Sequence, residues 1–524
     1  MKVDFSIVSE NLAKTFGDAE CIVNVERGRR YSFVEFHRLT NRIVNMMRDR
    51  LELRRGDFWL CVLNNDSLSL LSFFTAFKGE ACACYTNAID TLETQRSQIT
   101  LVGPKVVFTE VELLPTHYAL FKESGLTVVT MDPPGDDYPD VLHFWDLLEG
   151  VSDENPHVLS DDREDGLVLR FTGGTTGAPK GVLYSIDNWM GGKDLLYAMA
   201  DPVRSRSVRM LHFGLLSHAS GIVLLPIMFK GGCNITMNDR SMQTWCTTVE
   251  QEKITDSLMV PAMLYALLVA PEALAADLSS LQTMYYGASP MSPTRLKELR
   301  KRFGNIFVQL YGSSEHVAAT SVLSTAEHLP DASGSEAHLA SAGRVIPGVE
   351  LLIVDQNGNP VPDGQDGEIW MRSRAICMGY LNNPEKTESE FCNGFWKSGD
   401  MGRLDENGFL YVLDRVKDTI VYKDKNVYPN IVEGAIMAHP AVMMAAVVGI
   451  PDPDCGEAVH AEVVLKIDAS IDLDELRKFV GERLMPNDRP ATFNIAVELP
   501  LSPVGKVLRR TVRSICRDRT TAGS

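Results

Sequence analysis

The stretch FTGGTTGAPKGV, residues 171–182, contains four glycines, three threonines, a proline and a lysine in twelve positions. It lies between two β-rich runs, LVLRF and GVLYS, so we expect it to form a loop between two strands. Glycines let backbone amides approach an anion closely, hydroxyl groups donate to phosphate oxygens, and a lysine adds positive charge. The composition therefore indicates a loop that binds a polyphosphate.

This loop differs from a Walker phosphate loop. That motif requires GxxxxGK[ST] at the start of a helix, whereas Lys180 lies three residues after Gly177 and is followed by Gly181. The other interpretation is an ordinary hairpin turn rich in glycine and threonine. A turn requires only one or two special residues, and this stretch has many more, so we favour anion binding.

The bulk composition limits the possible partners. At roughly 150 residues per domain, a chain of 524 residues is expected to form about two to four domains. The formal charge of −18, with no basic stripe or basic arm, argues against nucleic acid. We expect a cytoplasmic protein, because no leader-like start and no run of about 18 apolar residues is present. The ten cysteines lack zinc-site spacing and are expected to be reduced, buried thiols.

The local patterns predict an α/β fold. In residues 31–51, Ser32 and Glu35 form a capping box ahead of apolar residues at helical spacing, which predicts an amphipathic helix. Residues 57–85 read as an apolar strand, a helix and a second apolar strand, the pattern of a βαβ unit. We therefore expect a large N-terminal domain of helix-covered, mostly parallel sheets.

The composition changes near the polar, charged stretch that ends with VKDTIVYKDKNVYP at residue 429. Short strand patterns such as AAVVGI and HAEVVLKI follow, with a helix pattern in LDELRKFVGERL and a basic end. This predicts a small, mobile α+β domain of ordinary domain size. The expected division is residues 1–414 and residues 415–524.

Seven sequence blocks, in order, extend from the opening stretch to the C-terminal region. The later six are QLYGSSEH, SAGRVIPG, GEIWMRS, FWKSGDMGRLDENGFLYVLDRVKD, NVYPNIVE and LPLSPVGKVLRR. With these blocks the chain resembles the adenylate-forming superfamily of acyl-CoA synthetases, luciferases and peptide-synthetase adenylation domains. The resemblance implies ATP, Mg²⁺ and CoA as the cofactor and co-substrates. It also implies a reaction in which a carboxylate forms an acyl-AMP and a thiol then takes the acyl group.

The resemblance assigns roles at the phosphates. Hydroxyl groups of the opening loop and Lys180 would hold the β- and γ-phosphates, and Glu315 would be the magnesium ligand, since Mg²⁺ prefers hard oxygen ligands. Ser314 replaces the usual threonine and can still reach the α-phosphate. The residues of this phosphate-binding set are Thr172, Gly173, Gly174, Thr175, Thr176, Gly177, Lys180, Gly312, Ser314 and Glu315.

The nucleoside would lie against a second set of residues. Gly287, Ala288 and Ser289 in YYGASPM would follow the edge of the adenine, and Tyr311 would stack on it. Asp400 and Arg415 fall where the family binds the ribose hydroxyls, and a carboxylate can accept two hydrogen bonds at once. Taken alone, Asp400 could be a turn residue and Arg415 a solvated surface charge.

Lys506 is the residue that the resemblance places between the substrate carboxylate and the α-phosphate, where its charge would screen two anions. The alternative is a solvated basic tail, but the flanking Pro503 and Gly505 favour a shaped loop. Because Lys506 lies on the small domain, that domain would close for adenylation and then move to admit the thiol. Lys417 occupies the hinge position of the family.

Some positions depart from the family pattern. Asp424 and Lys425 stand in a segment that is usually rich in glycine, next to the expected path of the pantetheine thiol. Ile431 replaces a common glutamate and Ile186 a frequent histidine, while Glu433 is kept. None of these positions is expected to touch the phosphates, so the departures leave adenylation intact and concern the thiol step.

The acid-binding pocket is predicted from the block FGLLSHASG. Relatives that activate amino acids carry an aspartate here for the substrate ammonium, whereas this chain has His218, which argues for an acid without an α-amino group. His218 could also be a hydrogen-bonded core histidine. The other expected pocket residues are Trp189, Met190, Phe213 and Met291, which suggest an apolar fatty, aryl or polycyclic acid.

Three functions remain open at this point. The first is an acid–CoA ligase, the second is a stand-alone adenylating enzyme that loads a carrier protein, and the third is a silent nucleotide-binding regulator. The presence of Lys506, Glu315 and Lys180 argues against the third. The sequence does not determine the oligomeric state, for which a homodimer is only the common default.

Overall fold

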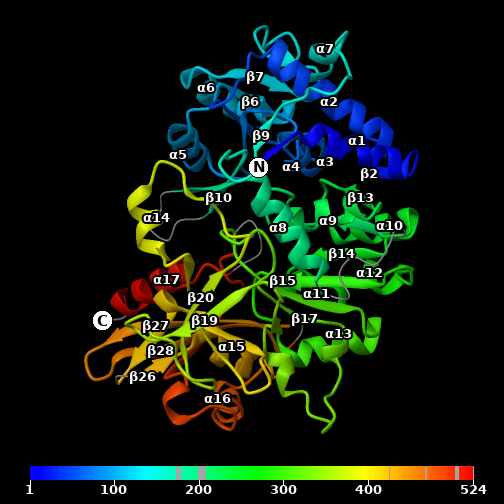
Figure 1. The fold of residues 1–524 in the computed structure, drawn as a ribbon. Coiled ribbons are helices and arrows are strands. Elements are labelled where there is room, and N and C mark those ends of the chain that lie inside the picture. The colour runs from blue at the N-terminus through cyan, green and yellow to red at the C-terminus, as the bar shows by residue number, and fades with distance from the viewer. Residues whose placement is uncertain (173–178, 199–207, 424, 467–468, 502–506, 523–524) are drawn as a thin grey trace.

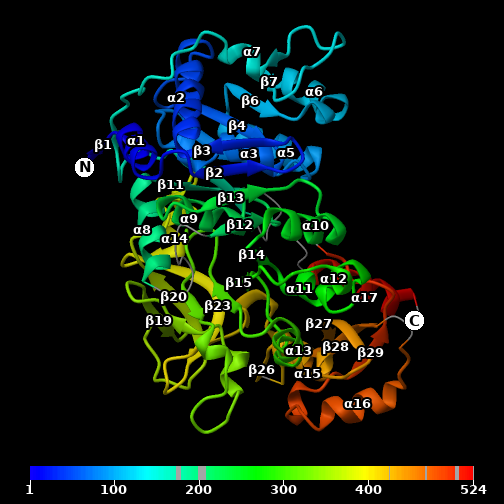
Figure 2. The ribbon, with the colours of Figure 1, turned by 90° about the vertical axis from the view of Figure 1, so that its right-hand side faces the viewer.

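The computed structural model describes residues 1–172, 179–198, 208–423, 425–466, 469–501 and 507–522. Two large sheets lie one below the other, and the C-terminal elements, coloured orange to red, lie at the bottom of the molecule (Figures 1 and 2). No helix in the described ranges is both long and apolar enough to cross a membrane.

In the described part of the chain the first large sheet has eight strands, and the six from β10 to β8 lie parallel. Its order is β21 (Gly379–Tyr380), β11 (Lys180–Tyr184), β10 (Val168–Thr172), β5 (Cys82–Tyr85), β4 (Phe58–Val62), β6 (Val106–Thr109), β7 (Thr127–Thr130) and β8 (Leu142–His143). The predicted βαβ unit is confirmed, because β4 and β5 pair in parallel.

The second large sheet has nine strands, parallel from β2 to β16. Its order is β18 (Arg344–Val345), β17 (Ser321–Leu323), β16 (Phe307–Tyr311), β15 (Thr283–Gly287), β14 (Asp256–Met259), β12 (Arg209–His212), β13 (Cys233–Thr236), β2 (Glu20–Asn24) and β3 (Arg29–Ser32). A separate short ladder pairs β1 (Lys2–Val3) with β9 (Ser160–Asp161).

Helices cover both large sheets. They are α1 (Phe5–Phe16), α2 (Phe33–Asp49), α3 (Asn65–Leu70), α4 (Phe73–Ala76), α5 (Leu92–Val102), α6 (Leu114–Glu123), α7 (Phe144–Leu148), α8 (Ile186–Tyr197), α9 (Leu224–Phe229), α10 (Met242–Glu252), α11 (Pro261–Leu267), α12 (Pro271–Ala275) and α13 (Pro293–Phe303). Helix α2 begins with the predicted capping box of Ser32 and Glu35.

Both faces of the first sheet are buried. On β4, Trp59 and Cys61 enter one apolar cluster, while the alternating Leu60 and Val62 enter another on the opposite face. Such two-sided burial is typical of parallel strands under helices and explains why β4 has no polar face in its sequence. The expected class, α/β with helix-covered and mostly parallel sheets, is confirmed.

A third, antiparallel sheet leads toward the C-terminal region. It contains β19 (Glu350–Val354), β20 (Gly367–Arg372), β23 (Phe395–Leu404), β22 (Phe391–Cys392) and β24 (Leu410–Arg415), and α14 (Pro384–Glu390) precedes β22. The predicted domain boundary after residue 414 falls within the last residues of β24.

The C-terminal elements form a fourth sheet with three helices. These are β25 (Ile420–Tyr422), β26 (Lys425–Val427), β27 (Val442–Asp452), β28 (Gly456–Leu465), β29 (Thr492–Ile495), α15 (Pro429–Met437), α16 (Leu473–Gly481) and α17 (Arg509–Ala522). Helix α17 buries Val512 and Cys516 against β27, so this basic segment is a packed element.

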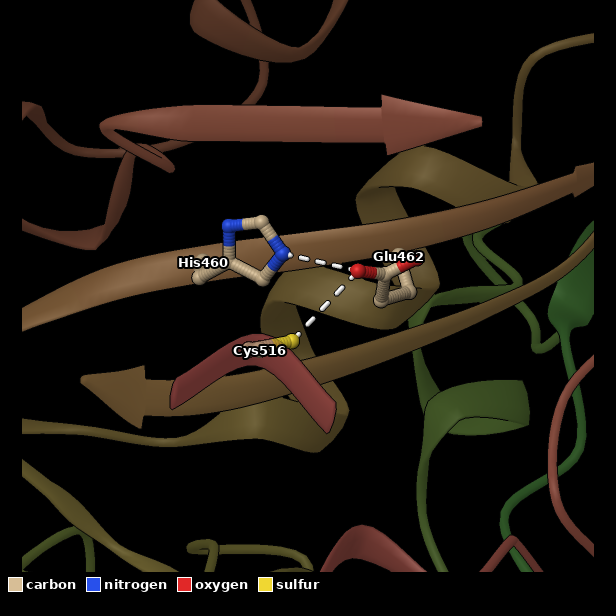
Figure 3. A group of neighbouring side chains, drawn as sticks. All are labelled: His460, Glu462 and Cys516. Atoms are coloured by element: carbon tan, nitrogen blue, oxygen red, sulfur yellow. Dashed lines mark hydrogen bonds and ion pairs between the residues drawn. The ribbon is translucent and has the colours of Figure 1, made fainter. Parts of the chain in front are cut away.

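A polar cluster joins Cys516 of α17 to His460 and Glu462 of β28 (Figure 3). His460, Glu462 and Cys516 bring their ligand-type atoms within 4.8 Å of one another. The Glu462 carboxylate, however, accepts hydrogen bonds from Arg519 at 2.7 Å and from Asn494 at 2.6 Å. The Arg519 guanidinium beside Glu462 would repel a metal ion. We therefore interpret the cluster as a set of hydrogen bonds that holds α17 against β28, and not as a metal site.

A second buried cluster joins the start of α17 to the end of β24. Arg509 donates to Asp414 at 2.9 Å and to Glu433 of α15 at 2.7 Å, and Asp414 is 1% exposed. Asp414 also accepts the backbone N–H of Asn430 at 2.9 Å. The guanidinium is therefore the cation that offsets the burial of two carboxylates.

Replacing Arg509 by alanine should destabilise the C-terminal domain by about 3–5 kcal/mol, because Asp414 and Glu433 would remain buried without their cation. Denaturant unfolding, followed by a probe in that domain, measures the change. Arg510→Ala removes the neighbouring exposed arginine and is the matched control, with an expected effect within about 0.5 kcal/mol. Equal effects of the two substitutions would contradict this account.

Candidate functional site

The opening stretch joins two antiparallel strands, as predicted. Thr172 at the end of β10 lies opposite Lys180 at the start of β11. Gly173, Gly174, Thr175, Thr176 and Gly177 lie outside the described residues. The ladder therefore places Thr172 and Lys180 side by side at the mouth of the hairpin, whichever path the intervening residues take.

Lys180 contacts two residues that the sequence did not indicate. Its ammonium donates to Glu390 Oε1 at 2.9 Å and lies 5.1 Å from the ring centre of Tyr380. Tyr380 belongs to β21, which pairs with β11, and Glu390 is the last residue of α14. Lys180 is thus held by the strand next to its own and by the helix that follows that strand.

Glu315 contacts the Tyr380 hydroxyl, and only 9% of the residue is exposed to solvent. The Tyr380 hydroxyl lies 3.1 Å from Glu315 Oε1 and also contacts Glu390. Burial raises the pKa of Glu315, while the hydrogen bond from Tyr380 and the charge of Lys180 oppose that rise. A cation that approached Glu315 would therefore meet a poorly solvated carboxylate, which is a suitable hard ligand for Mg²⁺.

The predicted adenine segments end two neighbouring parallel strands, so they lie at the same edge of the second sheet. Gly287 ends β15 and Tyr311 ends β16. A Cβ on Gly287 would come 2.1 Å from the carbonyl oxygen of Leu310, and one on Gly312 would come 2.6 Å from that of Ala318. Close backbone packing therefore requires both glycines, whatever ligand this edge binds.

Backbone conformation and packing define the residues that follow these two strands. Ala288 has a positive φ of 66°, which is uncommon for alanine, and is exposed, while Ser289 is half-buried. The carbonyl of Ser314 accepts a hydrogen bond from the Tyr184 hydroxyl, which fixes the backbone just before Glu315. Backbone packing thus determines where Ser314 and Glu315 lie.

Asp400, Arg415 and Tyr311 form one hydrogen-bonded group. Asp400 on β23 lies opposite Arg415 on β24, with 2.8 Å between Oδ1 and Nε. The other carboxylate oxygen, Oδ2, accepts from the Tyr311 hydroxyl at 2.7 Å. The ring expected to stack on adenine is therefore tied to the carboxylate expected to bind ribose.

The charges of the predicted site act on one another. Asp400 and Glu315 both raise the pKa of Arg415, against the lowering effect of its burial. Burial lowers the pKa of Lys417, and the nearby charges of Arg415 and Lys180 lower it further. The structure thus gathers these five residues, which span 238 positions of the sequence from Lys180 to Lys417. Lys506 lies outside the described residues.

The residues predicted for the acid pocket lie in different parts of the core. Trp189 of α8 stacks on Phe73 with ring centres 4.0 Å apart, in the apolar cluster of the first sheet. Phe213 and Met291 belong to a cluster on the second sheet. His218 is half-buried next to Ser217, whose hydroxyl lies 3.1 Å from its Nδ1. Their role as pocket residues stays a prediction.

Sequence reasoning missed Glu390, Tyr380 and Tyr184. Glu390 is 210 positions from Lys180, and nothing in the segment around it distinguishes it from neighbouring surface glutamates. The tyrosine of the GY pair at residues 379–380 was the one available signal, since a tyrosine between two apolar segments often places its hydroxyl in a buried polar network.

Comparison with known proteins gives consistent matches along the chain. A family model described as AMP-binding enzyme matches residues 9–381, and the model of the AMP-binding enzyme C-terminal domain matches residues 431–506. The medium/long-chain-fatty-acid–CoA ligase FadD8 of Mycobacterium tuberculosis is 37% identical over 422 residues, which are 79% of this chain and 72% of the relative.

Two further relatives differ in what receives the acyl group. The fatty acid–[acyl-carrier-protein] ligase ScoC of Streptomyces coeruleorubidus is 30% identical over 414 residues, 78% of this chain and 77% of the relative. The structure of the amide bond synthetase McbA from Marinactinospora thermotolerans superposes with a TM-score of 0.85 at 25% identity, covering 98% of this chain and 99% of that one.

Asp400→Asn should weaken ATP binding roughly ten- to a hundredfold, because the amide loses the charge and one of the two acceptor positions offered to ribose hydroxyls. Titration with MgATP measures the dissociation constant. Glu406→Gln, which neutralises an exposed carboxylate in the turn after β23, is the control and should leave ATP binding unchanged. Unaltered affinity in Asp400→Asn would remove Asp400 from the nucleotide site.

Proposed function

Because the chain belongs to the AMP-binding enzyme family, of the adenylate-forming superfamily, and works as an AMP-forming acid–CoA ligase, we propose that its substrate is an apolar carboxylic acid, fatty, aryl or polycyclic. One observation supports adenylation above all: Arg415 is ion-paired with Asp400 at 2.8 Å, and Glu315 interacts electrostatically with both Arg415 and Lys180, so charged residues from separate elements form one connected group. Phosphoryl and nucleotidyl transfer depend mainly on such positioning of charge.

In the first step a carboxylate oxygen of the acid attacks the α-phosphorus of ATP. The bond from that phosphorus to the bridging oxygen breaks, and pyrophosphate leaves with the electron pair. Lys180 and Thr172 would neutralise and orient the departing phosphates, while Glu315 would hold Mg²⁺, which spreads the phosphate charge when bound. Asp400 and Arg415 would fix the nucleoside, and Lys506 would screen the two anions that meet.

In the second step the thiol of CoA loses its proton to water, and the resulting thiolate attacks the acyl carbon. The carbon–oxygen bond to AMP breaks, and AMP leaves as an anion. His218 is the residue proposed to contact the acid, and the medium/long-chain fatty acid named for the FadD8 relative supports an apolar acid here. The second candidate acceptor is the phosphopantetheine thiol of a carrier protein, which the ScoC relative favours.

The proposal is tested by measuring pyrophosphate release from ATP with a panel of fatty, aryl and polycyclic acids. We expect release that depends on both Mg²⁺ and one class of apolar acid. The acceptor is then identified by comparing free CoA with a phosphopantetheinyl carrier protein. A chain that binds ATP but releases no pyrophosphate with any acid would be a regulator, and small hydrophilic acids as the preferred substrates would refute the apolar pocket.

Lys506→Ala should reduce acyl-AMP formation at least about a hundredfold and leave the conversion of supplied acyl-AMP to thioester near normal. The reason is that its charge is required only while the carboxylate meets the α-phosphate. Separate assays of the two half-reactions measure this, with Arg510→Ala as a nearby cation control. If both half-reactions fell together in a folded variant, Lys506 would have some other role.

A further inference from the structure

Glu390 is placed to meet the lysine of the phosphate loop from the side of α14. Its carboxylate is 21% exposed and accepts Lys180 at 2.9 Å and Lys386 at 2.5 Å, both on Oε1. Oε2 contacts the Tyr380 hydroxyl. Burial alone would raise the pKa of Glu390, but hydrogen bonds from Lys386, Tyr380 and Lys180 lower it to about 2, so it is an anion at neutral pH.

The position of this carboxylate is close to where a triphosphate would bind. Lys180 has one ammonium group, and in the described part of the chain this group forms an ion pair with Glu390. An incoming phosphate oxygen would seek the same ammonium and would meet the negative charge of Glu390 beside it. Like charges a few ångströms apart in a partly buried site repel strongly, so the two anions cannot both bind Lys180 at full strength.

We propose that Glu390 competes with the β- and γ-phosphates for Lys180 and thereby weakens the binding of ATP and pyrophosphate. This rests on the proposed adenylation function. Glu390 is then a positioning residue: it keeps Lys180 over Tyr380 before the triphosphate arrives and takes the ammonium back when pyrophosphate leaves. Because the Glu390 carboxylate lies beside Lys180 throughout, it favours the release of pyrophosphate.

The partners that remain make this exchange feasible. When Lys180 turns to a phosphate, Glu390 still has Lys386 and the Tyr380 hydroxyl, so it does not become a buried charge without a partner. A hydroxyl has one proton, so Glu390 and Glu315 share the donor of Tyr380, and a stronger hydrogen bond to one carboxylate weakens the bond to the other. Breaking the ion pair between Lys180 and Glu390 therefore affects, through the Tyr380 hydroxyl, the hydrogen bonding of Glu315, the predicted magnesium ligand.

Glu390→Gln tests the competition, because glutamine keeps the length and an acceptor oxygen but removes the charge. We expect the dissociation constants of MgATP and of pyrophosphate to fall by about two- to tenfold. The dissociation constant of AMP, which has no β- or γ-phosphate, should not change. Glu388→Gln removes an exposed charge from the same helix and should leave all three constants at the parent values.

Lys180→Ala separates this inference from the function on which it rests. Lys180→Ala alone should weaken MgATP binding, and adding Glu390→Gln to it should tighten binding clearly less than Glu390→Gln does in the parent, because the contested ammonium is gone and only the direct repulsion between Glu390 and the phosphates is removed. If Lys180→Ala leaves ATP binding unchanged, the proposed phosphate site itself fails. If Lys180→Ala weakens binding but Glu390→Gln does not tighten it, only the competition is refuted.

A variant that keeps the negative charge at position 390 provides the last check. Glu390→Asp keeps the charge with a shorter side chain and should bind MgATP more like the parent than Glu390→Gln does. A change of AMP and ATP affinity by the same factor in Glu390→Gln, or tightening by the same factor with and without Lys180, would show that Glu390 does not compete for Lys180 and would overturn the proposal.

Discussion

The arrangement of this site depends on the burial of the Glu315 carboxylate. Burying an ionised group is costly unless it is hydrogen-bonded or paired, so its surroundings must offset that cost. Tyr380 does so directly, and its own placement requires the short strand β21 to pair with β11. Lys180 starts β11, so the same pairing sets the distance between the phosphate-loop lysine and the predicted metal ligand.

The elements that the sequence predicted well are those fixed by local rules. The capping box before α2, the unit from β4 to β5, and the hairpin around the glycine-rich stretch each depend on residues within about 30 positions of one another. The motif blocks also located Asp400 and Arg415, which the ladder between β23 and β24 brings directly opposite each other. Strand pairing within one hairpin is therefore close to a local property.

The contacts that the sequence could not supply join distant segments. Glu390 looks like the other acidic residues of its short helix, and only the fold brings it to Lys180. Arg509 had the appearance of a solvated charge in a basic segment, yet it is the cation between Asp414 and Glu433. Trp189 was selected for its size near the pocket block; the fold stacks it on Phe73, a partner that the sequence did not indicate, and its contact with the acid stays a prediction.

The cluster of Arg509, Asp414 and Glu433 also determines where this chain could be cut and rejoined to a relative. Asp414 belongs to β24, whereas its two partners come from α15 and α17. A chimera joined after residue 414 would inherit a buried aspartate whose neutralising arginine must come from the foreign segment. Moving the seam ahead of Asp414 would transfer the whole ionic group as a unit, so the practical module begins before the predicted hinge at Lys417 rather than at it.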